Sequence, residues 1–528
     1  MKSAVAEEKY DSQPAVRQAK FFEGGLSERF EVEWDDGAKV TAMGSVPYFA
    51  QCLAVGGRFD ALCGDAPLRS SSNNAPKARD ILGTLLLSIL GGHTRYAHIN
   101  SLRNDGVGPR ALGMGKVVSE DSARRALLRA PGDELDAWLS AHELATFAPL
   151  LAEPYVLDID STVKPVYGRQ EGAENGCNPR KPGRPSHNIH TCFIGALRLI
   201  LRADVQPGKA HAGRHGAPPL WSLADSLPAA RRPRLLRGDV SHGSEAIMGE
   251  AETRGQHYLF KLARHGAVKT QFRRLCADGT AWADAGQGWQ ACEAELRFAG
   301  WSVPRRCVFI RRPRREADAT PAAPRQKTGS RQPGFDFIRP PDASPRWDYA
   351  CLATSDGTLP LPAVAQLYRD RADCENVFDE IKNQWGWSGF MTRDLKRCRV
   401  MARLVALIHN WWSIFTRLAR PDRHMEAVTS RPLLLQAVGR LVQSGRRRLL
   451  RLTSNHAMAA RARDTLERVR RFLNALRPTA EQLGAQRVWA VILSAAFVKW
   501  LKGSILHPCP DDATTCQPLA ENGSNCRF

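Results

Sequence analysis

The sequence predicts an α/β protein whose strand-rich core lies between helical N- and C-terminal regions. Runs of β-type residues alternate with helical segments from residue 155 to about 263, an order typical of an α/β core. The segments before and after this core repeat apolar residues at helical spacing. The chain has 528 residues, enough for roughly two to four domains.

The N-terminal part, residues 1–150, predicts a mainly helical DNA-binding region. Residues 31–43 alternate around Asp36 and Gly37, which predicts a β-hairpin. Residues 78–92 predict an apolar helix that ends at glycines. Residues 119–130, SEDSARRALLRA, begin with serine and acids and then present arginines. This pattern fits a helix that reads DNA, and a solvated surface helix is the alternative.

The core is expected in two pieces, residues 151–263 and 346–395. Residues 155–168 predict one strand, and residues 191–208 predict one or two more. A helix near residues 220–226, the strand RLLRGD, a helix from about Ser244 and a strand at 256–263 follow. The strand WDYACLATS resumes the core after residue 346.

Residues 264–345 interrupt this order and predict a partly β insertion rich in Trp, Gly, Pro and Arg. Within it, residues 317–334 predict a flexible loop, and the arginines of RRPRR at 311–315 could clamp DNA or be solvated. Residues 396–505 predict a helical region, and 506–528 a tail. Eleven arginines lie between residues 440 and 477, which suit DNA or a second protomer, or an exposed helix.

Charge is the most unusual property of the composition. The 75 Lys and Arg residues against 54 Asp and Glu residues give a net charge of +21. Such an excess favours a polyanionic partner, most often nucleic acid, with a merely basic protein as the alternative. The 13 cysteines contain no C-x-x-C pair, which argues against a zinc ribbon and fits reduced thiols in a cytosol.

The sequence predicts a soluble protein of the cytoplasm with no membrane partner. Residues 1–13 lack the apolar run of a signal peptide. The most apolar helical stretch, residues 400–418, is interrupted by Arg403, His409 and Asn410. It therefore predicts a buried helix and not a membrane span.

Residues 367–387, LYRDRADCENVFDEIKNQWGW, predict one amphipathic helix. At 100° per residue, Tyr368, Arg371, Glu375 and Lys382 form a narrow polar stripe at the edge of the core-facing side. The acids and arginine expected to face solvent are Arg369, Asp370, Asp373 and Glu380. A carboxylate in the stripe is held as catalysis or metal binding requires, and an ordinary i,i+4 ion pair of Arg371 with Glu375 is the alternative.

Two strands supply further carboxylates. Asp158 and Asp160 have the same parity in an otherwise apolar strand, where buried acids need a reason. Asp239 ends the strand RLLRGD, with a turn cap as the alternative role. Such residues gather at the carboxyl ends of strands. Together with one helix carboxylate they would suit two divalent cations.

These motifs resemble the DDE-class transposases of bacterial insertion sequences. The spacing Tyr368-x2-Arg371-x3-Glu375-x6-Lys382 matches their Y-R-E-K pattern. The block DSTV, followed by YGRQEG, CNP and KPGRPS, resembles one cut-and-paste subgroup, and LLRGDVSHGSE resembles the block of the second aspartate. The resemblance covers about residues 155 to 390, in the order of the family.

The resemblance implies a ribonuclease-H-like mixed sheet with flanking helices and a β-rich insertion between the second aspartate and the glutamate. It implies that Asp160, Asp239 and Glu375 bind Mg²⁺, with Mn²⁺ as a substitute. Asp158 is the less favoured first ligand, because the family's aspartate directly precedes the hydroxyl residues. The residues implied to hold DNA phosphates are Tyr368, Arg371 and Lys382. In family members that form a DNA hairpin, an aromatic residue of the insertion stacks on a flipped base. Trp347 or Tyr349 could have this role here. The alternative for Trp347 is that it is a core residue.

The implied function is that of a transposase. It would bind the inverted repeats at transposon ends, cleave double-stranded DNA and join the 3′ ends to target DNA by two-metal phosphoryl transfer. A synaptic homodimer and a bacterial, nucleoid-associated location are implied with it. A metal-dependent nuclease of the same fold without strand transfer, and an inactive DNA-binding relic that acts as a repressor, are the alternatives.

Three smaller features remain open. Lys181 and Arg184 lie in the basic, turn-rich stretch 178–190 and could contact DNA phosphates, with a solvated loop as the alternative. His187 and His190 lie three residues apart and are expected to be surface or structural histidines, since no cysteine or carboxylate completes a metal set. His242 follows Asp239 by three residues and could touch the site.

Overall fold

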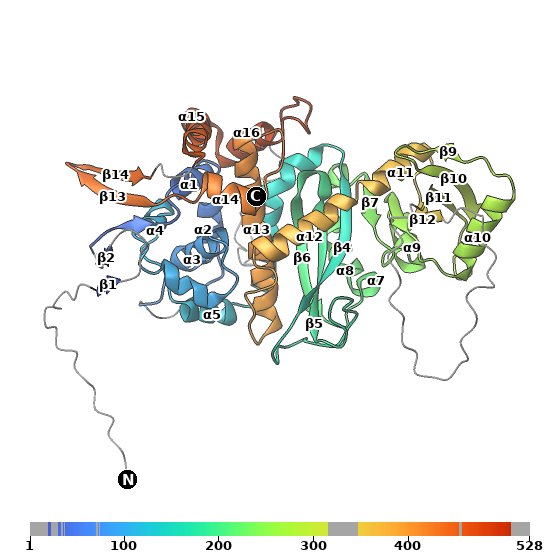
Figure 1. The fold of residues 1–528 in the computed structure, drawn as a ribbon, viewed down its shortest axis with the longest axis horizontal. Helices are drawn as coiled ribbons and strands as arrows, with labels where there is room; N and C mark the ends of the chain where they lie inside the picture. Colours follow the sequence, from blue (N-terminus) through green and yellow to red (C-terminus); the bar gives the residue numbers. More distant parts are fainter. Residues whose placement is uncertain are drawn as a thin grey trace, which may run out of the picture.

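The computed structural model describes residues 20–22, 30–32, 35, 37–69, 72, 74–314, 347–453 and 457–507. A sheet occupies the centre and one end of the elongated molecule, and the helices of the N- and C-terminal regions gather at the other end (Figure 1). The loop expected at 317–334 and the tail from residue 508 lie outside the described residues.

The centre is a nine-stranded mixed sheet in the order β6-β5-β4-β7-β8-β12-β11-β10-β9. Its strands are β4 (Val156–Pro165), β5 (Ser186–Ile194), β6 (Leu199–Pro207), β7 (Leu235–Gly238), β8 (Tyr258–Lys261), β9 (Ala283–Asp284), β10 (Gln290–Leu296), β11 (Arg305–Pro313) and β12 (Trp347–Thr354). Pairs β4–β7 and β7–β8 are parallel, and the other pairs are antiparallel. The predicted α/β class and the ribonuclease-H-like mixed sheet are confirmed.

The insertion extends the core sheet. β12 pairs with core strand β8 on one side and with β11 on the other. Leu259 of β8, Val308 of β11 and Leu352 of β12 share one buried cluster, and all three are 0% exposed. The strands of residues 264–345 therefore continue the sheet from its edge, because β12 offers them a ladder of backbone groups with which to pair.

Helices cover the sheet and form the N-terminal region. Helices that flank the core are α7 (Ala212–His215), α8 (Ala217–Asp225), α9 (Glu245–Thr253) and α10 (Gly266–Ala277). The N-terminal helices are α1 (Val46–Val55), α2 (Arg58–Gly64), α3 (Ala78–Leu90), α4 (Gly108–Ala111), α5 (Glu120–Arg129) and α6 (Gly132–Phe147). Helix α5 begins where the sequence predicts, with Ser119 accepting a hydrogen bond from the Ser122 N–H at 3.2 Å.

The C-terminal helices are α13 (Leu395–Ala419), α14 (Ala427–Leu434), α15 (Ala459–Leu483) and α16 (Ala485–Ala496). Helix α13 is buried along most of its length and contacts both β6 and α6. The stretch 400–418 is therefore a buried helix, as its polar interruptions predict. Among the described residues, no helix combines the length and the apolar character that crossing a membrane requires.

Two expectations for the terminal regions are wrong. The C-terminal region is not helical throughout, since β13 (Gly439–Ser444) and β14 (Arg447–Leu452) form a β-hairpin. Residues 31–43 do not form a hairpin around Gly37. Instead β2 (Phe30–Val32) pairs with β1 (Lys20–Phe22), and β3 (Val40–Thr41) pairs with β13. The turn signal is local, whereas the partner of β3 comes from about 400 residues further along the chain.

The single helix expected at 367–387 is two helices, α11 (Leu361–Arg369) and α12 (Ala372–Gln384). In a continuous helix the Leu367 carbonyl would accept the Arg371 N–H. Here the Arg237 guanidinium donates to that carbonyl, and the Arg371 N–H turns to the Tyr368 carbonyl at 3.2 Å. A side chain from β7 therefore breaks the helix at Arg371.

Candidate active site

Three charged side chains stand side by side where the parallel pairing of β4, β7 and β8 ends, although β4 itself continues to Pro165. The β4–β7 register places Ile159 opposite Gly238, so the next residues along the two chains are Asp160 and Asp239. The β7–β8 register places Gly238 opposite Phe260, so Lys261 follows at the same level. We call Asp160, Asp239 and Lys261 the strand-end row. The parallel register alone brings these groups together, as expected for the carboxyl ends of strands in an α/β sheet.

Arg371 lies over this row from the break between α11 and α12. Its guanidinium forms an ion pair with the Asp160 carboxylate, and both side chains are largely buried, at 14% and 13% exposed. Burial raises the pKa of Asp160 to about 6, even though Arg371 acts to lower it, and the nearby Asp239 charge raises it further. Two carboxylates held this close in a partly desolvated place favour a cation between them.

The pKa of Asp239 is shifted in the opposite direction from that of Asp160. Burial acts to raise the pKa of Asp239, but the hydrogen bond and charge of His242, together with Arg371, bring that pKa below its ordinary value. The His242 Nδ1 and an Asp239 carboxylate oxygen are 2.9 Å apart. The Ser241 N–H donates to the same oxygen at 2.9 Å. His242 therefore touches the site and fixes the orientation of Asp239.

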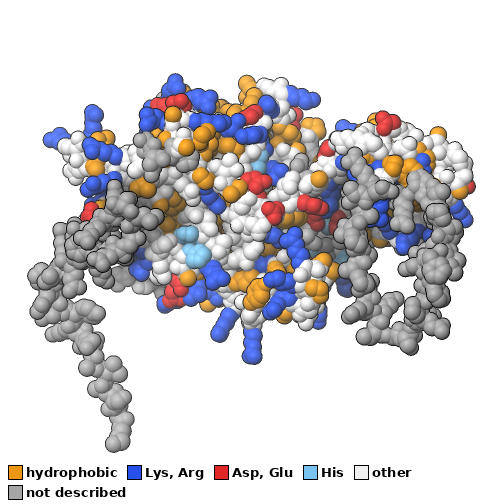
Figure 2. All heavy atoms as spheres, in the orientation of Figure 1, with side chains coloured by type: hydrophobic (Ala, Val, Ile, Leu, Met, Phe, Trp, Pro, Cys, Tyr) orange, Lys and Arg blue, Asp and Glu red, His pale blue; other side chains and the backbone are white. Residues whose placement is uncertain are grey.

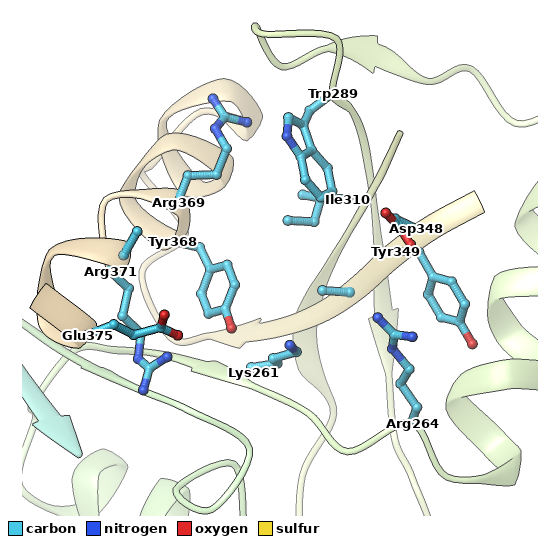
Figure 3. Close-up of a pocket in the computed structure, with 12 residues that line it drawn as sticks. Lys261, Arg264, Trp289, Ile310, Asp348, Tyr349, Tyr368, Arg369, Arg371 and Glu375 are labelled. Atoms are coloured by element: carbon cyan, nitrogen blue, oxygen red, sulfur yellow. The ribbon is translucent and has the colours of Figure 1, made fainter. Parts of the chain in front are cut away.

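A cavity opens beside the row, and Figure 3 shows its lining. Tyr368, Arg371 and Glu375 line it from α11, the break and α12, and Lys261 lines it from the sheet. The Lys261 ammonium lies 5.9 Å from the centre of the Tyr368 ring. Burial raises the pKa of Tyr368, with Arg371 acting against it, and burial and the charge of Arg264 lower the pKa of Lys261. The cavity is therefore lined with groups that can contact a phosphate.

Lys382 is the fourth residue of the predicted polar stripe. Burial and then the charge of Arg180 lower the pKa of Lys382, whereas Asp379 and Asp160 raise it. Lys382 is therefore within electrostatic reach of Asp160. Tyr368, Arg371, Glu375 and Lys382 border one region although they come from two helices, because the break at Arg371 lets α11 and α12 both follow the site.

Glu375 stands apart from the two aspartates in this conformation. Its side chain is exposed and lines the cavity. In the part of the chain that the structure describes, Asp160, Asp239 and Glu375 do not bring one oxygen each within 4.8 Å of one another. The guanidinium of Arg371 occupies the side of Asp160 that faces α12. The three carboxylates are thus neighbours around Arg371 and not a closed ligand set.

Asp158 has a structural role. Its two oxygens accept from the Arg237 guanidinium, with the Nη2 contact at 2.8 Å, and from the Gly195 N–H at 3.2 Å. The carboxylate is 1% exposed and the arginine 5%. Both Asp158 oxygens are thus engaged inside the fold, whereas Asp160 pairs with Arg371. The preference for Asp160 over Asp158 as a metal ligand stays a prediction.

Two further predictions for residues 367–387 are wrong. Arg369, expected to face solvent, is half-buried and donates to the Ala285 carbonyl at 2.8 Å. Helical periodicity turns Glu380 toward solvent, but its carboxylate is 2% exposed and accepts from the Trp385 indole at 3.1 Å and from the Ala427 N–H at 3.2 Å. Helical periodicity contains no information on tertiary contacts, and α13 and α14 cover this side of α12. Ile381 and Trp385, expected in the core, are both 0% exposed, and Asp370 is exposed as expected. The side chain of Asp373 lies outside the described residues.

The remaining candidates lie around this centre. Lys181 and Arg184 are exposed and pack on the exposed ring of Tyr167, 5.1 and 4.8 Å from its centre. His187 and His190 are buried in β5, as structural histidines are, and the His187 Nε2 contacts the Glu171 carbonyl at 2.9 Å.

The two aromatic candidates of the insertion differ in position. Tyr349 lines the cavity and stacks on Phe272, with ring centres 3.8 Å apart. Trp347 is half-buried, and the guanidinium of Arg311 lies 4.2 Å from its ring. Arg311 is also 3.8 Å from the Trp282 ring, so this arginine of RRPRR is packed between aromatics.

Sequence reasoning missed Lys261, Arg264 and Trp289, which line the same cavity. Lys261 carried a usable signal, since it ends a strand that follows the second aspartate strand in the chain. Arg264 and Trp289 carried none, because their position depends on how β12 and β11 extend the sheet.

The fold is a ribonuclease-H-like mixed sheet, and two carboxylates and a lysine meet where its parallel pairing ends, near a helix that carries a third carboxylate. The model of one family, Transposase DDE domain group 1, matches residues 65–474. The match covers most of the chain, and the protein belongs to this family of DDE transposases.

Similarity outside this family model is distant. A cryo-EM structure of a piggyBac transposase synaptic complex with hairpin DNA is similar over 83% of this chain and 85% of that chain, at 9% sequence identity and a TM-score of 0.34. No curated protein sequence is significantly similar to this chain.

Proposed function

We propose that this protein binds the inverted repeats at the ends of a bacterial insertion sequence of the Y-R-E-K branch, cleaves the DNA there and joins the 3′ ends to target DNA. Membership of the DDE transposase family supports the reaction class. The observation that carries the proposal is the strand-end pair Asp160 and Asp239, with Arg371 paired to Asp160 and Glu375 on the cavity that Arg371 also lines.

The donor chemistry of this site fits hard divalent cations. Mg²⁺ prefers carboxylate oxygens and keeps positions for water and substrate phosphates. Burial raises the pKa of Asp160 to about 6, and the nearby charge of Asp239 contributes to this rise. We assign Asp160, Asp239 and Glu375 as the residues that hold Mg²⁺, or Mn²⁺ in its place. The cation would supply charge that acidifies a water or 3′-hydroxyl and offsets charge on the phosphate.

The residues of the chain position the DNA. Tyr368, Arg371 and Lys382 would contact phosphate oxygens near the cleaved bond, and an arginine fork suits a phosphate in two-point contact. Arg371 now pairs with Asp160 and would turn to the phosphate when a cation neutralises that carboxylate. His242 holds Asp239 in one orientation throughout.

The remaining regions would extend this DNA contact. Residues 1–150 would form the end-binding region, with α5 as a candidate reading helix because Arg125 and Arg129 are exposed on it. The catalytic core would comprise 151–263 and 346–395, the insertion 264–345, the C-terminal region 396–505 and the tail 506–528. Lys181 and Arg184 would contact the DNA backbone beside the core. The aromatic cavity residue Tyr349 is better placed than Trp347 to meet a base, should the reaction pass through a DNA hairpin.

Basic side chains gather over β13 and β14, at the upper left of Figure 2. The exposed arginines of this β-hairpin are Arg440, Arg446, Arg447, Arg448 and Arg451. Their charge is not paired with acidic side chains of the same hairpin, whose residues 439–452 contain none. They suit a phosphate backbone, either of the end or of target DNA bound by a homodimer.

A cleavage assay tests the proposal. The full-length protein is incubated with a duplex taken from the DNA that flanks its own gene, with Mg²⁺ or with Mn²⁺. We expect nicking at a repeat end and joining of the new 3′ end to a second duplex. Glu375→Ala should abolish nicking and leave binding to the end, measured by gel shift, largely unchanged.

Other outcomes have distinct meanings. Nicking without joining would identify a nuclease of the same fold, and binding without nicking would identify an inactive repressor. Cleavage that survives Glu375→Ala would refute the assigned carboxylate set.

A further inference from the structure

A second cluster of metal-binding groups lies apart from the strand-end row. Glu380 of α12, His409 of α13 and His424, which lies between α13 and α14, each direct one ligand atom to a common point. These three atoms lie within 4.8 Å of one another, and no other group of three or more His, Cys, Asp or Glu residues in the described chain does so. The side chains of Glu380, His409 and His424 are 2%, 1% and 11% exposed.

The hydrogen bonds around His409 leave one of its nitrogens without a partner. The Asn410 amide is fixed by the backbone of Ile200, because its Oδ1 accepts from the Ile200 N–H at 2.9 Å and its Nδ2 donates to the Ile200 carbonyl at 2.6 Å. The His409 Nδ1, 3.4 Å from that Oδ1, must therefore carry the proton. The lone pair then lies on Nε2, which has no hydrogen-bond partner and sits 3.9 Å from Glu380 Oε1.

The other two ligands also have outer partners. The His424 Nδ1 contacts the Ser413 hydroxyl at 3.2 Å, and its Nε2 lies 2.7 Å from Glu380 Oε2. Glu380 Oε1 accepts from the Trp385 indole and the Ala427 N–H. Metal-binding histidines in proteins have a polar partner on the second ring nitrogen, and ligating carboxylates are hydrogen-bonded in the same way. All three side chains of the cluster meet this pattern.

We propose that Glu380, His409 and His424 form a zinc site that ties α12 to α13 and α14. Two imidazoles and one carboxylate are a donor set that zinc uses in proteins. Zinc–ligand bonds of about 2.0–2.2 Å place ligand atoms about 3.3 Å apart. The His424 Nε2 lies 2.7 Å from Glu380 Oε2 and the His409 Nε2 lies 3.9 Å from Glu380 Oε1, so side-chain shifts would bring one carboxylate oxygen to this distance from both imidazoles. Zinc would replace the proton between Glu380 and His424.

The chemistry of the cluster favours zinc over magnesium. Imidazole nitrogens suit Zn²⁺, and Mg²⁺ prefers oxygen ligands. Arg431 packs on Trp385, 4.3 Å from the ring, within electrostatic reach of Glu380, so the single carboxylate gives no excess of negative charge to attract hard cations. The site would therefore bind a different metal from the strand-end row, and its presence does not depend on the proposed function.

The position of the cluster gives the metal a structural role. Glu380 follows the proposed cation ligand Glu375 by five residues on the same helix. Glu380 is held by groups of α13 and α14, so a zinc ion here would fix the C-terminal half of α12. The helix that carries Glu375 would then be held by zinc in its C-terminal half and, at its N-terminus, by the ion pair of Arg371 with Asp160.

Zinc content of the tag-free full chain tests this inference. After incubation with Zn²⁺ and removal of the excess, we expect about one Zn²⁺ per chain, measured by elemental analysis, and a rise in Tm relative to chelator-treated protein. Asp160→Asn and Glu375→Ala should retain this zinc, since they alter only the strand-end site. His507→Gln, a change at an exposed histidine, should also retain it.

Two variants report on the cluster itself. His424→Gln keeps a donor for Glu380 and should fold with little change in Tm without metal, while losing the bound zinc and the zinc-dependent rise in Tm. His409→Gln should lose the zinc as well. Co²⁺ in place of zinc should give the visible absorption of a four-coordinate ion in the wild type and not in these variants.

Wild-type protein without zinc after this treatment, or His424→Gln and His409→Gln variants that keep it, would overturn the proposal. In the first case the cluster is a hydrogen-bonded ion pair of Glu380 with His424. In the second case the zinc is held elsewhere, and its absence from Asp160→Asn would place it at the strand-end row.

Discussion

Arg371 and Asp160 are separated by 211 positions in the sequence, yet their side chains form an ion pair at the centre of the candidate site. The pair exists because α12 begins beside the middle of β4, next to the point where its parallel pairing with β7 ends, and the helix break lets Arg371 turn toward the sheet. The contact of the Arg371 guanidinium therefore depends both on the position of α12 and on the charge of the strand-end row.

We expect Arg371→Ala to lower end cleavage by about 10²-fold, as removal of a single transition-state donor does in other enzymes. Arg254→Ala is the control, because the Arg254 side chain bonds to Glu250 at 2.6 Å and does not line the cavity. Single-turnover cleavage of a labelled end measures both. Equal losses in the two variants would show that Arg371 acts only through the fold.

The buried pair of Asp158 and Arg237 should stabilise the fold and take no part in chemistry. Arg237→Met leaves the Asp158 carboxylate buried without its ion-pair partner and should cost about 3–5 kcal/mol of unfolding free energy. The double variant with Asp158→Leu should recover much of this loss, because no buried charge remains. Urea denaturation of the wild type, the two single variants and the double variant measures their unfolding free energies. An Arg237→Met variant as stable as the wild type would contradict the assignment.

Lys164 gives the protein a stability that depends on pH. Its side chain is 5% exposed, and burial lowers its pKa from 10.5 to about 8. A lysine with a lowered pKa binds its proton more weakly in the folded state, so its unfavourable contribution decreases as pH rises from about 8 toward 10.5. From pH 7 to pH 9 the wild type should gain about 1 kcal/mol relative to Lys164→Met.

Denaturation of both proteins at the two pH values checks this difference, which cancels the titration of all other groups. Equal pH dependence in wild type and Lys164→Met would show that the Lys164 ammonium is not buried in its charged form. The variant lacks the hydrogen bond from the Lys164 Nζ to the Gly389 carbonyl at 2.5 Å, but it lacks this bond at both pH values, so the comparison is not affected.

The β-hairpin of β13 and β14 should contribute charge to DNA binding. Replacing Arg446, Arg447 and Arg448 with Gln should weaken binding to any duplex. The salt dependence should flatten by about 0.9 in log–log slope for each phosphate that the variant no longer neutralises. The Lys versions of the same triple change should keep the slope. Affinity at several salt concentrations measures both, and an unchanged slope in the Gln variant would place the hairpin away from DNA.

Local pattern was sufficient for most elements of this protein. The apolar alternation around Asp160 predicted β4, and Ser119 with its acids predicted α5, because a strand period and a helix cap depend on neighbours in sequence. The three motif blocks also located the carboxylates and the Tyr368, Arg371, Glu375 and Lys382 set. For these residues, the side-chain type and the spacing can be read directly from the sequence.

Tertiary contacts decided the rest, because they bring in groups that no window of sequence contains. The Arg237 guanidinium donates a hydrogen bond to the Leu367 carbonyl and so interrupts a helix that periodicity predicts to be continuous. Strand β3 found its partner in β13 and not across the turn at Gly37. Glu380, polar and placed on the outer side of a helix by its angle, is buried because His409 and His424 arrive from α13 and the segment after it. The sequence by itself determined which residue types stand at which spacing, and only the packing of distant elements decided which side chains meet.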